Sequence, residues 1–290
     1  MRKYYEAYDD RYRQIHARGQ RWTADVSTPV VLKAIQENCC KDSSRILEIG
    51  CGEGRDARVI LEAGYSLNAT DISEEAISFC KETMPRFAGS FSVMDCINGI
   101  HDIKYDFIYS VAVIHMLVDD SDRKAFYSFI RDHLESDGLA LICTMGDGES
   151  EFCTDPSQAF ELKERNHVSG KVMVAGTTCR IVSWPTFLQE LSRAGLEVIE
   201  KGITSAMPDF DRLMYVLVRK AWGCLFLFDS DDSGRNQYHK EQGYKTPFNA
   251  EESFSLLGFH VRHIVAGKEE RDVGCDEHGN YTPPLVDPDE

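Results

Sequence analysis

Short apolar runs alternate with amphipathic stretches along most of the chain. The run RILEI (residues 45–49) predicts a buried strand, and RDARVILEAG (residues 55–64) has the spacing of a helix that stops at Gly64. The alternation continues to residue 144, and it predicts strands at 66–71, 91–95, 105–114 and 138–144 and helices at 73–83 and 122–134. Residues 1–40 have an amphipathic and mostly helical pattern that is rich in Tyr and Arg.

The pattern changes after residue 144. Residues 145–183 are a long irregular insertion, and GKVMVAGTTCRIV within it predicts a hairpin whose two strands flank Gly176. Residues 184–195 predict a further helix, with Pro185 in its first turn. Two apolar stretches, LEVIEKGI and RLMYVLVRK, then predict two strands with no helix between them.

Strands alternating with helices and closed by a strand pair are typical of a doubly wound α/β domain. We expect this domain to span residues 1–219, with a lid helix at its N-terminus and the insertion at 145–183 as a cap over the substrate. Residues 220–290 have a different residue pattern, which consists of an apolar run, an acidic loop and a tail that ends PPLVDPDE. We treat them as a C-terminal appendage of unknown role.

Composition narrows the class of protein. The chain has 290 residues with 42% apolar content, and no apolar run reaches the roughly 18 residues that a membrane span needs. The N-terminal stretch lacks the apolar core of a secretory signal. Ten scattered cysteines without a C-x-x-C pair indicate free thiols, so we expect a cytoplasmic protein. A net charge of −16 disfavours nucleic acid and favours a small-molecule substrate.

Three glycines in alternation follow the first strand, in the stretch ILEIGCGEGRDA at residues 46–57. Either the turn needs backbone angles that only glycine tolerates, or a ligand approaches the main chain closely at Gly50 and Gly52. In open parallel sheets, ligands bind outside the carboxyl ends of the strands. The spacing G-x-G-x-G differs from the G-x-G-x-x-G of phosphate-binding dinucleotide loops. A ligand without that phosphate chemistry is therefore expected here.

Acidic residues close the next two strands. Asp71 ends the second strand, where a carboxylate can accept hydrogen bonds from both hydroxyls of a ribose. Asp95 follows the third strand, where a carboxylate can accept a bond from the exocyclic amine of adenine. Together with the glycine turn, these two carboxylates suit a ligand in which adenosine is joined to its other part by a group without the charge of a phosphate.

These features resemble the class I S-adenosylmethionine-dependent methyltransferases. The resemblance covers residues 1–219 and implies a seven-stranded Rossmann-like sheet of order 3-2-1-4-5-7-6 with an antiparallel last strand, and S-adenosyl-L-methionine as the cofactor. It is carried by LEIGCGEG at 47–54, ATDIS at 69–73, MDC at 94–96, YDFIYSVAVIHML at 105–117 and SDGLALI at 136–142.

The resemblance also implies roles for individual residues. Gly50, Cys51 and Gly52 would let the methionyl part of the cofactor lie against the backbone. Glu48 would orient that turn or meet the methionine ammonium group. The remaining cofactor contacts would be Asp71 on the ribose, Ile72 on the adenine face, Asp95 and the Cys96 N–H on the adenine edge, and Ser110 and Val111 under the methionyl group.

The acceptor is less well defined. SVAVIHML replaces the N-P-P-Y signature of enzymes that modify amines and bases, so the chain is closer to the tellurite-resistance and thiopurine methyltransferases. RYRQIHARGQRW resembles the entry helix of the thiopurine group and makes Trp22 a lid residue over the cofactor. His115, just past the fourth strand, is the predicted general base, since its ordinary pKa is near 6.5. The predicted substrate contacts are Tyr5, His16, His167, Arg180 and Trp184.

Two alternative functions stay open, and both concern other classes of protein. DSDDSGRN at 229–236 resembles the metal-binding half of a toprim domain, which would make the chain a nucleic-acid-modifying enzyme. A zinc set of His260, His263, Cys275 and His278 is disfavoured, because residues three apart in a strand point to opposite faces, and no metal site is predicted. A regulator that binds the cofactor without catalysis is the other alternative. The oligomeric state does not follow from the sequence.

Overall fold

The computed structural model describes residues 2–23, 26–99, 102–167, 169–205 and 212–221, together with the backbone of four short strands beyond residue 221. Contacts between residues divide the chain into two units, Met1–Ala221 and Trp222–Glu290. The first unit carries the sheet and the helices. The assignment of residues 220–290 as an appendage of unknown role stays a prediction.

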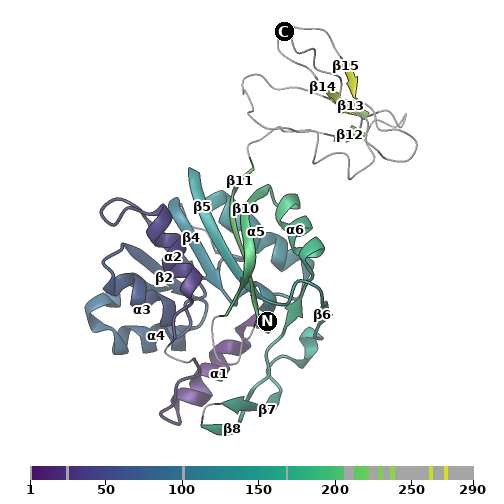
Figure 1. Ribbon diagram of the computed structural model, residues 1–290. Coiled ribbons are helices and arrows are strands. Elements are labelled where there is room, and N and C mark those ends of the chain that lie inside the picture. Colours follow the sequence, from purple (N-terminus) through teal and green to yellow (C-terminus); the bar gives the residue numbers. More distant parts are fainter. Residues whose placement is uncertain are drawn as a thin grey trace. The chain divides into compact units, whose positions relative to one another are not determined.

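A seven-stranded sheet forms the centre of the first unit (Figure 1). Its order is β10-β11-β5-β4-β1-β2-β3, with β11 antiparallel to both of its neighbours. Counted within the sheet, this is 3-2-1-4-5-7-6, so the predicted topology is confirmed. The strands are β1 (Ile46–Ile49), β2 (Leu67–Asp71), β3 (Phe91–Val93), β4 (Tyr105–Val111), β5 (Leu134–Met145), β10 (Leu196–Thr204) and β11 (Leu213–Lys220).

The helices begin and end where local signals predict. The Ser73 hydroxyl accepts a bond from the Ala76 N–H at the start of α4, and Gly64 takes a left-handed φ of 88° just after α3. The helices are α1 (Ala7–His16), α2 (Pro29–Asn38), α3 (Arg55–Glu62), α4 (Glu74–Thr83), α5 (Asp120–His133) and α6 (Trp184–Arg193). Short 3₁₀ turns are η1 (Tyr4–Glu6), η2 (Pro85–Ser90), η3 (Ile114–Met116) and η4 (Pro156–Gln158).

The two faces of the sheet carry separate apolar cores, because side chains alternate along a strand. On β4, Phe107 and Tyr109 pack into the core that α2, α3 and α4 cover. Ile108 points the other way, into the core under α5 and α6. The central strands are thus buried on both faces, which is the usual reason for their continuous apolar runs.

The insertion folds differently from the sequence prediction. β8 (Gly170–Ala175) pairs with β7 (Leu162–His167), and β9 (Arg180–Ile181) pairs with β6 (Phe152–Cys153). The hairpin predicted to turn at Gly176 is therefore wrong. The cause is β7, whose sequence LKERNH holds a single apolar residue and so gives no hydrophobic signal of a strand.

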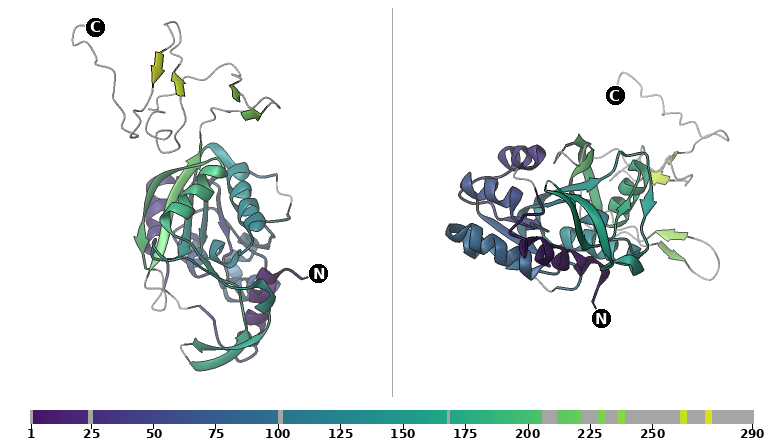
Figure 2. Two further views of the ribbon diagram at one scale, coloured as in Figure 1. Left: turned by 90° about the vertical axis from the view of Figure 1, so that its right-hand side faces the viewer. Right: turned by 90° about the horizontal axis from the view of Figure 1, so that it is seen from below.

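Helix α1 lies against β8, so the N-terminal helix and the insertion meet within the first unit (Figures 1 and 2). Ile15 of α1 packs on Val172 and Val174 in a small core of its own. We call η1, α1 and the β7–β8 hairpin together the lid. Two distant parts of the sequence thus form one structural element.

The second unit contributes two strand pairs, β12 (Phe228–Ser230) with β13 (Asn236–Tyr238) and β14 (Val261–His263) with β15 (Arg271–Val273). The side chains of the predicted toprim-like loop and of the candidate zinc set lie outside the described residues. Within the ranges that the structure does describe, no helix is both long and apolar enough to cross a bilayer.

A buried ion pair holds α5 and α6 to the turn at residues 114–117. Arg123 is 2% exposed, and its guanidinium contacts both carboxylate oxygens of Glu190 at 2.9 and 2.6 Å. A third nitrogen donates to the carbonyls of Ile114 and Leu117 at 2.8 and 3.2 Å. This pair therefore fixes the 3₁₀ turn that carries His115.

Removal of the Glu190 carboxylate should destabilise this fold strongly. We expect Glu190→Ala to lower the free energy of unfolding by about 3 kcal/mol, because it leaves a buried guanidinium unpaired. The control is Glu197→Ala, which removes the partner of Arg219 in a surface pair and should cost less than about 1 kcal/mol. Urea denaturation measures both. Equal losses for the two variants would show that the Arg123 pair does not hold the turn.

Candidate functional site

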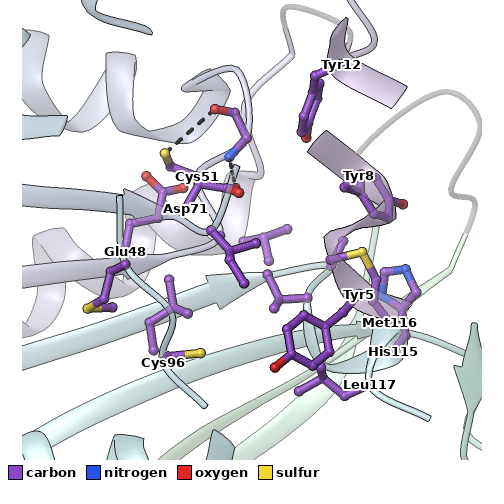
Figure 3. A pocket seen from close by; sticks show the side chains of 18 of the residues that line it. Tyr5, Tyr8, Tyr12, Glu48, Cys51, Asp71, Cys96, His115, Met116 and Leu117 are labelled. Atoms are coloured by element: carbon purple, nitrogen blue, oxygen red, sulfur yellow. Dashed lines mark hydrogen bonds between the residues drawn. The ribbon is translucent and has the colours of Figure 1, made fainter. Parts of the chain in front are cut away.

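A pocket opens at the carboxyl ends of β1, β2 and β4, between the sheet and the lid (Figure 3). It brings together residues from six separate segments of the chain. The lining residues are Tyr5, Tyr8, Tyr12, Trp22, Thr23, Glu48, Ile49, Gly50, Cys51, Gly52, Arg55, Asp56, Asp71, Ile72, Met94, Asp95, Cys96, Ile97, Val111, Ala112, Val113, His115, Met116 and Leu117.

The glycine turn meets both conditions that its sequence suggests, backbone angles that favour glycine and a lack of space for side chains. Gly50, Gly52 and Gly54 have φ values of 76°, 53° and 75°, in the left-handed region that favours glycine. Space is short as well. A Cβ at Gly50 would lie 2.2 Å from a methyl of Val113, and one at Gly52 would lie 2.6 Å from the hydroxyl of Tyr12. The main chain is therefore the surface that the turn presents to the pocket.

Asp71 joins the end of β2 to this turn. Its carboxylate accepts the N–H of Gly52 at 2.8 Å and the N–H of Ser73 at 2.8 Å. Burial raises the pKa of Asp71, and these backbone donors oppose the rise. The residue thus fixes the glycine turn as well as facing the pocket.

Glu48 lies beneath the turn in an apolar setting. It is 2% exposed, and one of its carboxylate oxygens has no hydrogen-bond partner. Burial, and after it the negative charge of Asp56, raises the pKa of Glu48 to about 8, while the nearby Tyr109 hydroxyl and the charge of Arg55 oppose this. At neutral pH the carboxyl group is therefore mostly protonated, and a cation at this end of the pocket would favour its ionisation.

Asp95 shapes the far end of the pocket. Its carboxylate accepts the N–H of Ile97 and the side-chain amide of Asn98, each at 2.8 Å. The same amide donates to the hydroxyl of Tyr5 at 3.0 Å. Burial raises the pKa of the neighbouring thiol of Cys96, so this end holds a neutral thiol beside a carboxylate.

Three tyrosines of the lid face the pocket (Figure 3). Tyr5, Tyr8 and Tyr12 follow one another at the spacing of a helical face, i, i+3 and i+7. The ring of Tyr12 is buried, which raises the pKa of its hydroxyl well above the ordinary value. The three rings form the aromatic wall opposite the glycine turn.

Glu53, inside the G-C-G-E-G turn, ties the lid to the floor of the pocket. It is fully buried, and its carboxylate accepts the N–H groups of Trp22 and Thr23 at 2.8 and 2.7 Å. His16 lies 2.8 Å from Glu53 through one ring nitrogen and 2.8 Å from Glu75 through the other. Sequence reasoning missed Glu53, although an acid between two glycines of a tight turn was a usable signal.

Arg11 joins the two halves of the lid and was also missed. Its guanidinium donates twice to the carbonyl of Ala175, at 3.1 and 2.9 Å, and once to the hydroxyl of Thr177. It also lies over the rings of Tyr8 and Trp22, at 4.7 and 4.6 Å from their centroids. An arginine in a predicted amphipathic helix gives no sequence signal of such burial.

His115 lies in η3 and lines the pocket, 3% exposed. Its Nδ1 atom is buried and has no hydrogen-bond partner within the described part of the chain. Burial, followed by the positive charges of Arg123 and Arg11, lowers the pKa of His115 to about 3. The imidazole is therefore neutral at physiological pH and holds an added proton weakly.

Five predicted site residues do not line the pocket. His16 bridges Glu53 and Glu75, and the buried hydroxyl of Ser110 lies beneath the pocket floor. The other three belong to the insertion or its border: His167 stacks on Trp22, Arg180 pairs with Asp120, and Trp184 packs beside Gly148. Their assignment to cofactor or substrate stays a prediction.

The other predicted site residues all lie in this one pocket. They are Tyr5, Trp22, Glu48, Gly50, Cys51, Gly52, Asp71, Ile72, Asp95, Cys96, Val111 and His115. Among the residues that the structure describes, no three His, Cys, Asp or Glu side chains gather in a way that could hold a metal ion. The pocket therefore offers carboxylates, main-chain groups and aromatic rings to a ligand.

Comparison with known proteins finds curated relatives in two strains of Haemophilus influenzae and a common fold among solved structures. TehB of Haemophilus influenzae, named a probable S-adenosyl-L-methionine-dependent methyltransferase, is 27% identical over 131 residues. That match covers 41% of this chain and 44% of TehB, so the chain spans less than half the length of this relative.

Two solved structures share the architecture at low sequence identity. The glycopeptide N-methyltransferase MtfA, complexed with S-adenosyl-L-methionine, is 18% identical with a TM-score of 0.51 over 67% of this chain and 87% of its own. The 1,6-didemethyltoxoflavin-N1-methyltransferase of Burkholderia thailandensis is 16% identical with a TM-score of 0.50, over 66% and 75%. These likenesses show the fold.

The sequence of the domain itself identifies the family. Residues 19–201 match the family model described as a methyltransferase domain, and this range contains the glycine turn, Asp71, Asp95 and His115. Of the elements of the first unit, the range leaves out η1, α1, the end of β10 and β11. The chain therefore belongs to the methyltransferase-domain family, whose cofactor is S-adenosyl-L-methionine.

Proposed function

We propose that this chain transfers a methyl group from S-adenosyl-L-methionine to a small-molecule acceptor in the pocket beneath the lid. The observation that carries the proposal is the arrangement of the pocket. A main-chain turn and three carboxyl groups, Glu48, Asp71 and Asp95, lie on one side, and an aromatic lid lies on the other. The acidic side suits a cofactor with an ammonium group, a sulfonium and a ribose.

The cofactor would bind along the strand ends. Glu48 would meet the methionine ammonium group, Asp71 the ribose hydroxyls, and Asp95 with the Cys96 N–H the adenine edge. Ile72 would pack on the adenine face, and Trp22 would close the lid over the cofactor. The methyl group would then face residues 113–117, where the aromatic side of the pocket leaves room for an acceptor.

Methyl transfer requires little covalent chemistry from the protein. The acceptor atom forms a bond to the methyl carbon, the bond from that carbon to sulfur breaks, and its electron pair stays on the sulfur. Alignment of the two reactants alone can supply several kcal/mol of the barrier. The lowered pKa of His115 favours a role as a hydrogen-bonding group over a role as a proton acceptor. Its assignment as the general base stays a prediction.

A small acceptor is supported by the enclosed site and by the charge of the chain. With 48 acidic against 32 basic side chains, the protein repels phosphate backbones. The 1,6-didemethyltoxoflavin-N1-methyltransferase of Burkholderia thailandensis, whose structure contains a small-molecule acceptor, supports a small acceptor by analogy. Eight free cysteines among the described residues favour a reducing compartment, so we propose a cytoplasmic location.

Asp71→Asn should weaken binding of S-adenosylhomocysteine at least tenfold. The amide keeps the shape of the side chain but loses the charge that accepts the ribose hydroxyls and the Gly52 N–H. Calorimetry on the folded variant measures the affinity, and Asp137→Asn at an exposed position of β5 is the control. An unchanged affinity in Asp71→Asn would exclude this side chain as a cofactor contact.

Cofactor affinity should depend on pH through Glu48. The raised pKa means that the carboxyl group is protonated below about pH 8, and it must release that proton to meet an ammonium group. Affinity for S-adenosylhomocysteine should therefore rise roughly fifty-fold from pH 6 to pH 8, with about one proton released per molecule bound at pH 6.

Glu48→Gln is the control for this pH dependence, because it cannot titrate but leaves the cofactor's own amine unchanged. Its affinity profile should be nearly flat between pH 6 and pH 8. If the two proteins share one profile, the ammonium group does not lie at Glu48.

The two halves of the lid should respond to the cofactor together. Because Arg11 bonds α1 to the end of β8, hydrogen exchange should slow in both segments when S-adenosylhomocysteine binds. Mass spectrometry of peptides from α1 and from residues 170–177 measures this. Protection confined to one segment would mean that the halves move separately.

A further inference from the structure

The acidic and the aromatic sides of the pocket differ in charge. All of the carboxyl groups in the lining, those of Glu48, Asp56, Asp71 and Asp95, come from the strand ends and the start of α3. The lining residues contributed by η1, α1 and residues 111–117 include no carboxylate. An acceptor next to the cofactor would meet this second side.

A buried cation lies behind that side, and none of the carboxylates that the structure describes pairs with it. Arg11 is 4% exposed, and its described contacts are the carbonyl of Ala175, the hydroxyl of Thr177 and the faces of Tyr8 and Trp22. An arginine side chain keeps its charge in proteins. The positive charge therefore lies against the faces of two rings that line the pocket, and no carboxylate among the described residues pairs with it.

The turn that carries His115 is positively polarised as well. Arg123 donates to the carbonyls of Ile114 and Leu117, on either side of the histidine, although Glu190 balances its charge. The charged groups that act on His115 are Arg123 of α5 and Arg11 of α1, and both disfavour its protonated form. A neutral imidazole can still donate one hydrogen bond.

The Nδ1 atom of His115 can make that bond. It is buried, belongs to a side chain that lines the pocket, and has no hydrogen-bond partner among the described residues. An unpaired buried polar atom destabilises the protein, and a ligand that pairs with it recovers the lost free energy. The atom therefore marks where the acceptor makes its polar contact.

Resting on the function proposed above, we propose that the acceptor is a flat aromatic molecule with an acidic hydroxyl or thiol, bound as its anion. His115 donates from Nδ1 to the anion, and Arg11 supplies the positive potential that holds it. The ring of Tyr8 and the side chain of Met116 pack on its flat faces. His115 is then a binding residue for the acceptor.

The charges in the reaction favour such an acceptor. The phenol or thiol gives its proton to water before binding, so no base in the pocket is required. Its lone pair forms the new bond to the methyl carbon, and the electron pair of the broken bond stays on sulfur, which yields a methyl ether or thioether and S-adenosylhomocysteine. Two opposite charges disappear, which a water-poor pocket favours. An amine acceptor would instead create a cation near Arg11.

The test uses 4-nitrophenol as a probe, because its anion absorbs visible light. Spectroscopic titration of the complex with S-adenosylhomocysteine should show the bound probe as the anion, with its pKa at least one unit below that in water. The anion should bind at least tenfold more tightly than 4-nitroaniline, its neutral analogue of the same shape. Equal binding of the two, or no binding of the anion, would overturn the proposal.

Variants of His115 and Arg11 test which residue is responsible for binding of the anion and for the shift in its pKa. His115→Phe should lose most of the affinity for the anion and keep the affinity for S-adenosylhomocysteine. Arg11→Met should abolish the pKa shift of the probe, whereas Arg11→Lys, which keeps the charge, should retain at least half of it. A shift that persists in folded Arg11→Met would contradict the role of Arg11. If the wild-type protein does not bind S-adenosylhomocysteine at all, that result overturns the proposed function instead.

Discussion

The turn after β1 must present its main chain to the pocket, and the rest of the site is built around that requirement. Three glycines in the left-handed region make the turn tight enough, and there is no space for a Cβ at Gly50 or Gly52. Asp71 holds the turn from the sheet side by accepting the Gly52 N–H. Glu53 holds the N-terminal segment to the same turn, so floor and lid meet at one point of the chain.

Charge is distributed to match this geometry. Carboxyl groups gather along the strand ends, where we propose that the cofactor places its cationic groups, and burial keeps Glu48 protonated until a cation arrives. The opposite wall has tyrosines, a neutral histidine and the buried charge of Arg11 behind them. A pocket of this kind would hold a positively charged cofactor and an acceptor of opposite charge on separate sides and bring their reacting atoms together.

The sequence carried enough information for the sheet and for the strand-end residues. Apolar runs and helical spacing predicted the topology, and the order of motifs located the glycine turn, Asp71 and Asp95. The pairing inside the insertion was missed, because β7 is polar and its partner is chosen by the hairpin turn and by packing on α1. Arg11 and Glu53 act through contacts between segments far apart in sequence, which periodicity cannot reveal.

The most direct test of the proposed cofactor position is a crystal structure with S-adenosylhomocysteine bound. We expect the ribose hydroxyls on Asp71, the amino group at Glu48, and the sulfur facing an open space that Tyr8, His115 and Met116 border. A cofactor bound outside this pocket, or one whose amino group lies at His115 with its adenine at Glu48, would contradict this position.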